Sequence, residues 1–312
     1  MSQPPAAGAV AFIGAVAFIG LGRMGLPMAA RLAQAGVPVR AYDSSPAARA
    51  SAQAAGLPVA DSIQAAAAGA DVVITMLPAS AHVLECYAAI LGELKDSAVL
   101  LDCSTAGVAG AGAIHAAARE RGLASLDAPV SGGVDGATAG TLTFMVGGEA
   151  ADLARVEPLL AAMGRRVFHC GPPGAGQAAK ICNNLILGAS MIAVSEAFVL
   201  GEALGLSPQS LYDVASTSSG RCFALTENCP APGPRPASPA NHGYQAGFAG
   251  DLMLKDLRLA QAAAREAGVA ARLGEQAAAI YERFSAEGRG ALDFSGVIVS
   301  IRESGTAPRE AP

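Results

Sequence analysis

The sequence has few charged residues and no cluster of basic ones. Charged side chains make up 15% of the 312 residues and hydrophobic side chains 52%, which is typical of a compact protein with room for two domains. The net charge is −5, the pI is near 5.4, and the 21 basic residues are scattered along the chain. These features argue against a nucleic-acid-binding surface, so we expect no nucleic-acid partner.

Patterns that bind metals or form disulfide frameworks are also missing. The six cysteines include no C-x-x-C pair, and the four histidines stand apart from one another and from the cysteines. We therefore predict neither a metal site nor a set of disulfides. A chain of this kind fits the cytoplasm, which is the compartment that we expect.

Long hydrophobic runs are rare, but one occurs near the N-terminus, where the hexapeptide AVAFIG is repeated at 9–14 and 15–20. The first basic residue is Arg23, so nothing basic precedes the run and a signal peptide is not expected. Elsewhere Gly, Pro and charged residues interrupt the alanine-rich runs, so we expect no contact with a membrane. Residues 1–14 are predicted to form an N-terminal extension, because only the second copy leads into a recognisable motif.

That motif is the most informative part of the sequence. Its six residues are Gly20, Leu21, Gly22, Arg23, Met24 and Gly25. A G-x-G-x-x-G turn between an apolar strand and a helix lets the backbone approach a dinucleotide pyrophosphate and directs a helix N-terminus at it. The pattern predicts cofactor binding, although a plain structural turn would have the same glycines.

Asp43 ends a second predicted strand, 37–42, about twenty residues after the turn. A carboxylate at this position accepts hydrogen bonds from the ribose hydroxyls of NAD and repels the 2′-phosphate of NADP. NAD is therefore the expected cofactor. Arg40 and Arg49 lie close by in the sequence and keep NADP open as the alternative.

The order of predicted elements divides the chain into two domains. Apolar runs at 70–77, 98–103 and 123–128 are typical of buried parallel strands, with alanine-rich helices between them. We predict an α/β fold with a Rossmann-type, doubly wound, mostly parallel sheet over 15–175. An all-α helical domain should follow over 176–312, with helices at 177–204, 207–216, 252–267 and 274–287.

Two polar groups of residues stand out as candidates for chemistry. Lys180 and Asn184 are four residues apart on a predicted apolar helix, with Asn183 beside them, so they share one helix face. A lysine that acts as a base needs its pKa lowered from about 10.4, and burial can do this. The segment Ser131-Gly132-Gly133 offers a hydroxyl and backbone amides to a carboxylate. The simpler interpretations are a solvent-reaching lysine, an amide pair between helices, and an ordinary turn.

Six motifs in this order resemble the β-hydroxyacid dehydrogenase family. They are Gly20 to Gly25, Met76-Leu77-Pro78, Asp102 to Thr105, Asp127 to Gly133, Gly140-Thr141-Leu142, and Gly176 to Asn184 with Lys180 inside. Later segments, among them 218–223, 238–248, 252–257 and 293–295, resemble the members that act on 3-hydroxyisobutyrate. One departure is Phe223, where similar sequences often have Trp.

The resemblance implies a role for each matching residue. Lys180 would be the catalytic acid/base, with Asn184 assisting it. The substrate would be bound by Ser131, Gly132, Gly133, Asn183 and Phe248. Besides the glycine-rich turn and Asp43, the cofactor would be bound by Leu77, Pro78, Thr105 and Lys255.

The expected reaction is the NAD-dependent oxidation of the small hydroxy acid 3-hydroxyisobutyrate in valine breakdown, by a homo-oligomer that is a dimer or a tetramer. Two alternatives stay open: a family reductase for tartronate semialdehyde, or for succinic semialdehyde or glyoxylate, and a dinucleotide-binding protein without catalysis. A decarboxylating relative of the 6-phosphogluconate type would need a basic phosphate clamp, which the sequence does not offer.

Overall fold

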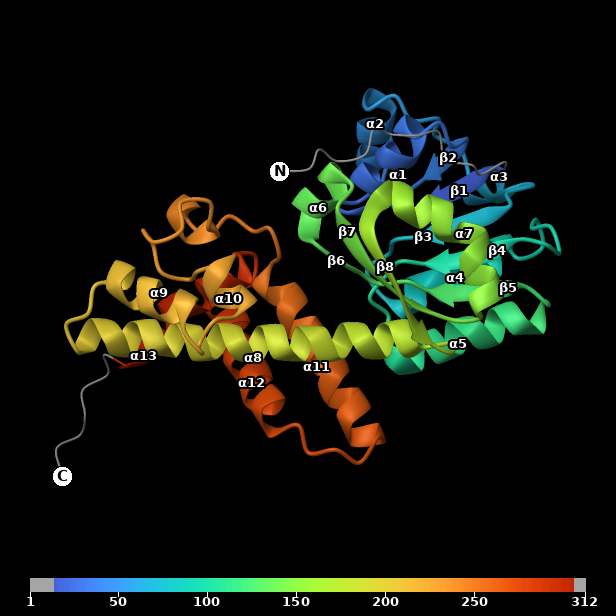
Figure 1. The fold of residues 1–312 in the computed structure, drawn as a ribbon. Coiled ribbons are helices and arrows are strands. Elements are labelled where there is room, and N and C mark those ends of the chain that lie inside the picture. Colours follow the sequence, from blue (N-terminus) through green and yellow to red (C-terminus); the bar gives the residue numbers. More distant parts are fainter. Residues whose placement is uncertain (1–13, 306–312) are drawn as a thin grey trace. The chain divides into compact units, whose positions relative to one another are not determined.

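The computed structural model describes residues 14–305 (Figure 1). The predicted extension, residues 1–14, lies outside the described residues except for Gly14. The chain forms two compact units that divide between Lys180 and Ile181, inside one long helix. The domain boundary expected at 175/176 stays a prediction.

The first unit contains an eight-stranded sheet in the order β2-β1-β3-β4-β5-β7-β6, with β8 paired to β7. Strands β1 to β5 are parallel, whereas β7 runs antiparallel to β5 and β6 and parallel to β8. The strands are β1 (Val16–Ile19), β2 (Val39–Tyr42), β3 (Val72–Thr75), β4 (Val99–Asp102), β5 (Ala124–Asp127), β6 (Val130–Ser131), β7 (Leu142–Gly147) and β8 (Gly164–Gly171).

Helices cover both faces of this sheet, as the residues of β1 illustrate. Val16 and Phe18 point into one hydrophobic core, while Ala17 and Ile19 point into the other. A strand buried on both faces reads as a continuous apolar run, which is why the sequence predicted it. The helices are α1 (Gly25–Gln34), α2 (Pro46–Ala54), α3 (Ile63–Ala67), α4 (Ser80–Ile90), α5 (Gly107–Glu120), α6 (Gly133–Ala139) and α7 (Ala150–Met163). The predicted doubly wound, mostly parallel sheet is confirmed.

Strands β6, β7 and β8 were not predicted from the sequence. β6 has only two residues, and β8 carries Arg165 and Arg166 and is largely exposed at the margin of the sheet. Such strands lack the long apolar run that marks a central strand. β6 and β8 are strands because they pair with β7. This pairing arises only in the folded chain.

The second unit is helical, and the four predicted helices are present. They are α8 (Ala175–Ala203), α9 (Pro208–Thr217), α11 (Gly250–Glu266) and α12 (Arg272–Phe284). The structure adds α10 (Phe223–Thr226), α13 (Val297–Gly305), two short 3-10 helices (Pro239–His242 and Phe294–Gly296) and a short π-helical turn (Ser285–Arg289). Two hydrophobic cores lie inside this unit, and α8 contributes Met191, Ile192 and Phe198 to them.

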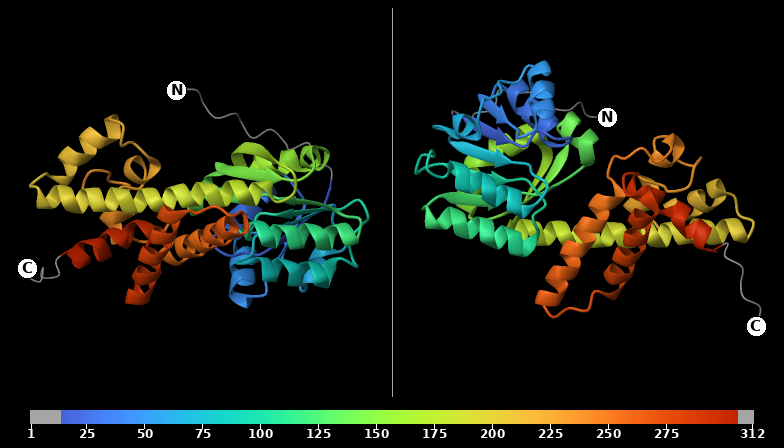
Figure 2. Two further views of the ribbon diagram at one scale, coloured as in Figure 1. Left: turned by 90° about the horizontal axis from the view of Figure 1, so that it is seen from below. Right: turned by 180° about the vertical axis from the view of Figure 1, so that it is seen from behind.

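Helix α8 has 29 residues and is unbroken in all views (Figures 1 and 2). By length and composition alone it could cross a membrane, and 39% of its apolar window is buried inside the protein. Its apolar composition has a structural explanation where its side chains enter the two cores of the second unit. The expectation that no membrane is involved stays a prediction.

Candidate active site

The glycine-rich turn connects β1 to α1, and packing explains two of its three glycines. Gly20 has φ +100°, and a Cβ there would lie 2.3 Å from the carbonyl oxygen of Met76. A Cβ on Gly25 would lie 1.9 Å from the carbonyl oxygen of Gly20. A Cβ on Gly22, in contrast, would meet no atom within 4 Å. Gly22 is therefore not required by the fold, but it suits the close approach of a pyrophosphate to the backbone.

The N-terminus of α1 has no side-chain cap and no acidic residue, which favours the binding of an anion. Met24 is the N-cap residue and gives no side-chain hydrogen bond, and the first turn contains no acidic residue. Backbone N–H groups at such an uncapped helix start attract phosphate. Arg23 beside it is exposed. Leu21 differs, because its side chain is 2% exposed and belongs to the core, so only its backbone is open to the predicted cofactor role.

Asp43 is joined to the turn by hydrogen bonds. Its Oδ2 accepts from the backbone N–H of Leu21 at 2.7 Å, and its Oδ1 accepts from the N–H of Ser45 at 2.7 Å. Arg49 donates to the carbonyl oxygen of Asp43 at 2.7 Å. The structure thus brings together the turn and the carboxylate that the sequence paired with it. This last hydrogen bond holds the guanidinium of Arg49 next to the backbone of Asp43.

The loops after β3 and β4 hold the next group of predicted cofactor residues. The N–H of Leu77 donates to Oγ of Ser104 at 2.8 Å, which ties the segment of Leu77 and Pro78 to the segment of Thr105. Leu77 also lies next to Gly20, since a Cβ there would be 2.9 Å from its Cδ2. These loops and the glycine-rich turn therefore meet at the carboxyl ends of β1, β3 and β4, where ligands bind in open α/β sheets.

Ser131, Gly132 and Gly133 lead from β6 into α6. Ser131 is half-buried, and both glycines have positive φ, at +133° and +63°. This conformation strongly favours glycine. The segment therefore has the accessible backbone and hydroxyl that a carboxylate cradle requires, and its role stays a prediction.

Helix α8 carries the candidate catalytic pair. Lys180 and Asn184 are both buried, and their spacing places them on one helix face. Asn184 donates from Nδ2 to Oδ2 of Asp256 on α11 at 2.5 Å and accepts at its Oδ1 from Nδ2 of Asn183 at 2.9 Å. These two bonds fix the orientation of the Asn184 amide. Asn183 itself is exposed.

Phe248 and Lys255 belong to the second unit. Phe248 packs edge-to-face on Phe294 with ring centroids 5.7 Å apart, and its N–H donates to Asp293 at 3.0 Å. Nζ of Lys255 lies 3.9 Å from Oδ1 of Asp256. Asp256 therefore contacts both Asn184 and Lys255, two residues that the sequence had singled out.

Sequence reasoning gave no role to Asp256 and Gln177, although both are buried. Asp256 lies on the inner face of α11 among Met253, Leu254 and Leu257. A lone acid at such a position is a signal that could have found it, because a buried carboxylate needs a partner. Gln177 offers a similar signal, one turn before Lys180.

The residues present fit a dinucleotide: an open Gly22, an uncapped helix start and a carboxylate at the end of β2. Within residues 14–305, no group of three or more His, Cys, Asp or Glu side chains could hold a metal ion.

Known proteins match almost the whole chain. Residues 15–171 match the family model described as the NAD binding domain of 6-phosphogluconate dehydrogenase. Residues 174–301 match the model described as NAD-binding of NADP-dependent 3-hydroxyisobutyrate dehydrogenase. A probable 3-hydroxyisobutyrate dehydrogenase of Mycobacterium tuberculosis is 50% identical, over 92% of this chain and 97% of the relative. An NAD-dependent L-serine dehydrogenase of Pseudomonas aeruginosa is 48% identical, over 90% of this chain and 96% of the relative.

The solved structure of the Mycobacterium tuberculosis 3-hydroxyisobutyrate dehydrogenase with L-serine has a TM-score of 0.90 and 49% identity. The match covers 93% of this chain and 100% of that one. Together with the matched family models, this similarity confirms that the chain is an oxidoreductase that uses a nicotinamide dinucleotide. The predicted cofactor, NAD, agrees with this finding. The chain belongs to the β-hydroxyacid dehydrogenase family and is similar to its 3-hydroxyisobutyrate dehydrogenases.

Proposed function

We propose that this enzyme oxidises 3-hydroxyisobutyrate to methylmalonate semialdehyde with NAD, in valine breakdown. The observation that carries the proposal is the buried face of α8, on which Lys180 and Asn184 lie one turn apart. The names of the relatives support the substrate. The carboxylate of Asp43 next to the glycine-rich turn supports NAD as the cofactor.

Bound NAD supplies the acceptor for a hydride from the CH2OH carbon of the substrate. The chain supplies the proton chemistry and the positioning. Lys180, with its amine neutral, takes the hydroxyl proton as the carbonyl forms, and returns it in the reverse reaction as an ammonium. Asn184 orients the reacting hydroxyl. Ser131, Gly132 and Gly133 hold the substrate carboxylate, which fixes the CH2OH group relative to Lys180.

L-Serine is a second candidate substrate. It has the same carboxylate and CH2OH group as 3-hydroxyisobutyrate, with an ammonium in place of the methyl group. A relative at 48% identity is named for this activity, and the structure at TM-score 0.90 is titled with L-serine. Production of NADH or NADPH from 3-hydroxyisobutyrate, L-serine, D-glycerate and 4-hydroxybutyrate ranks the candidates. Activity on none of the four would refute the proposed function.

We further propose a cytoplasmic homo-oligomer, a dimer or a tetramer, that binds neither nucleic acid nor membranes. The net charge of −5 supports the absence of a nucleic-acid surface. Apolar side chains exposed on the second unit support subunit contacts.

Replacing Lys180 by alanine tests the catalytic role. We expect kcat to fall by about 100- to 10,000-fold, because the hydroxyl proton loses its acceptor. Binding of NADH, followed by its fluorescence, should stay within about twofold of the wild-type value. The matched control is Lys95→Ala, which removes an exposed lysine paired with Asp71 at 2.7 Å. A folded Lys180→Ala enzyme with normal turnover would exclude this lysine as the acid/base.

A further inference from the structure

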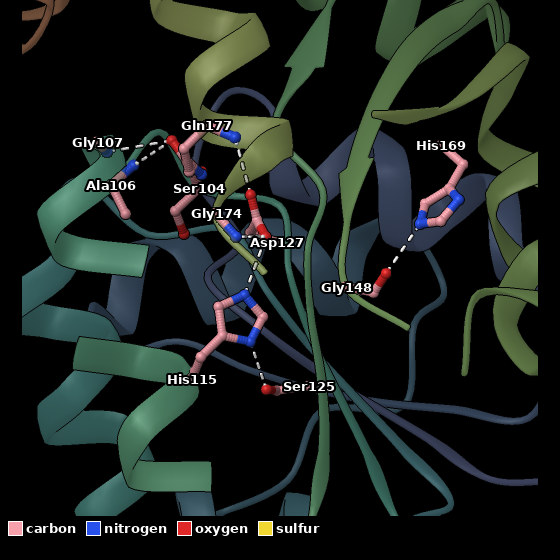
Figure 3. A network of polar contacts seen from close by, with 10 residues as sticks. All are labelled: Ser104, Ala106, Gly107, His115, Ser125, Asp127, Gly148, His169, Gly174 and Gln177. Atoms are coloured by element: carbon pink, nitrogen blue, oxygen red, sulfur yellow. Dashed lines mark hydrogen bonds and ion pairs between the residues drawn. The ribbon is translucent and has the colours of Figure 1, made fainter. Parts of the chain in front are cut away.

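The side chain of Gln177 is fully buried and makes three hydrogen bonds to one loop (Figure 3). Its Oε1 accepts from the backbone N–H groups of Ala106 and Gly107, each at 3.1 Å, and its Nε2 donates to the carbonyl oxygen of Ser104 at 2.7 Å. Thr105 lies between these partners. The amide of Gln177 therefore holds the backbone on both sides of a predicted cofactor residue.

The backbone of Gln177 is also held by a hydrogen bond, to the carboxylate of Asp127. Asp127, at the end of β5, accepts from the N–H of Gly174 at its Oδ1 and from the N–H of Gln177 at its Oδ2, both at 2.8 Å. The carboxylate thus caps the first turn of α8. Behind it, Nε2 of His115 lies 2.9 Å from Oδ1 of Asp127, and Nδ1 lies 2.6 Å from Oγ of Ser125 (Figure 3).

The first turn of α8 packs closely against the strands beside it. A Cβ on Gly176 would lie 2.3 Å from the carbonyl oxygen of Met145 and 2.6 Å from that of Asp127. The helix therefore starts in direct contact with the backbone of β5 and β7. Lys180 follows Gln177 by three residues, so it lies on the next turn of the same helix face.

From these contacts we infer that Gln177 is a positioning residue that couples the Thr105 loop to Lys180. The inference rests on the proposed function, in which Thr105 contacts the cofactor and Lys180 moves the proton. One rigid amide then sets both the cofactor side and the proton side of the reaction. A displacement of about 1 Å at either side is enough to reduce turnover strongly.

The isosteric substitution Gln177→Glu isolates this role. One oxygen of the new carboxyl group can still accept from Ala106 and Gly107. When the group is ionised, its other oxygen has no proton to donate to the carbonyl oxygen of Ser104. At pH 8 we expect kcat to fall and KM for NAD to rise, each about tenfold, because a buried acceptor is left opposite an acceptor. Protonation of the new group restores the donor. The ratio of variant to wild-type kcat/KM should therefore recover at least tenfold between pH 8 and pH 5.5.

Other titratable groups near Gln177 are present in both proteins. Asp127 and His115 face the first turn of α8, and Asp102 accepts from the N–H of Ser104 at 3.0 Å. Because the measured quantity is a ratio at each pH, titration that is the same in both proteins cancels. Gln177→Ala should lose activity without any recovery at low pH. Gln209→Glu, an exposed exchange of the same kind on α9, is the matched control and should match the wild type.

The experiment separates failure of the inference from failure of the proposed function. Folding is followed at every pH by circular dichroism, and NADH affinity is measured without substrate. A folded Gln177→Glu enzyme with wild-type kcat, KM and NADH affinity at all pH values would overturn the inference. Loss of the fold in both Gln177 variants would overturn it too, since the residue would then serve the domain rather than the reaction. If Lys180→Ala retains turnover, the proposed function fails, whereas weakened NADH binding in Gln177→Glu would still support the coupling to the Thr105 loop.

Discussion

At the scale of single residues, Asp43 is where the coenzyme preference is expected to reside. Both of its oxygens accept backbone N–H groups, from Leu21 and Ser45, which fixes the carboxylate beside the glycine-rich turn. A carboxylate has further lone pairs for ribose hydroxyls after making these two bonds. Its charge opposes a 2′-phosphate at the same place.

Asp43→Asn should reduce the preference for NAD over NADP. Asparagine keeps one acceptor for the turn but loses the charge and the second acceptor. We expect the ratio of kcat/KM for NAD to that for NADP to fall at least tenfold, because a charge-assisted hydrogen bond is lost and a repulsion is removed. Steady-state kinetics with both coenzymes measure this ratio, and Asp96→Asn in an exposed loop is the control. An unchanged ratio in a folded variant would mean that Asp43 does not contact the ribose.

At the scale of elements, the register of two strands creates a buried acidic site. β3 and β4 pair so that Thr75 lies opposite Asp102, and Oγ1 of Thr75 donates to Oδ1 of Asp102 at 2.8 Å. Within residues 14–305, Oδ2 of Asp102 finds no hydrogen-bond partner. Burial, opposed by bonds from Ser104 and Thr75, raises the pKa of Asp102 from 3.8 to about 6. The pairing of β3 and β4 thus buries a carboxyl group whose neutral form is favoured in the folded protein.

This pKa predicts how stability changes with pH. The unfolded chain releases the Asp102 proton near pH 4 and the folded chain near pH 6. The contribution of the neutral group is therefore complete below pH 4 and is lost as the pH rises to about 6, by about 3 kcal/mol at most. Asp102→Asn imitates the neutral form at every pH. Its melting temperature should exceed the wild-type value by several degrees at pH 8 and by about half as much at pH 5, where the folded wild-type group is still mostly neutral but the unfolded one is already ionised.

Differential scanning calorimetry at the two pH values measures this difference. Asp61→Asn, which replaces an exposed carboxylate of the same unit, serves as the control. Equal effects of Asp102→Asn at pH 5 and pH 8 would contradict a raised pKa at this position.

At the scale of the whole molecule, the second unit exposes several large apolar side chains. At the C-terminal end of α8, Leu200 is 60% exposed and Leu204 is 72% exposed, and Ile186 is 68% exposed earlier in the helix. Exposed apolar side chains on one helix are often buried in subunit interfaces. We therefore expect the C-terminal end of α8 to lie at a contact between subunits.

We expect the double variant Leu200→Glu with Leu204→Glu to lower the oligomeric state. Charges at a buried contact cost several kcal/mol, enough to dissociate a dimer or tetramer at micromolar concentration. Light scattering coupled to size-exclusion chromatography measures the mass, and Gln209→Glu on the neighbouring helix α9 is the control. A wild-type protein that is already monomeric would refute the expected homo-oligomer.

Local patterns in the sequence determined the glycine-rich turn, the five central strands, the four predicted helices and the shared face of Lys180 and Asn184. Each depends on residues close together in the chain, whose spacing is itself the physical requirement. Only the tertiary structure decided that Asp256 binds Asn184, 72 residues away, and that Gln177 brackets Thr105. Hydrogen bonds between distant segments form where packing removes water from polar groups, and no local pattern encodes which groups will meet.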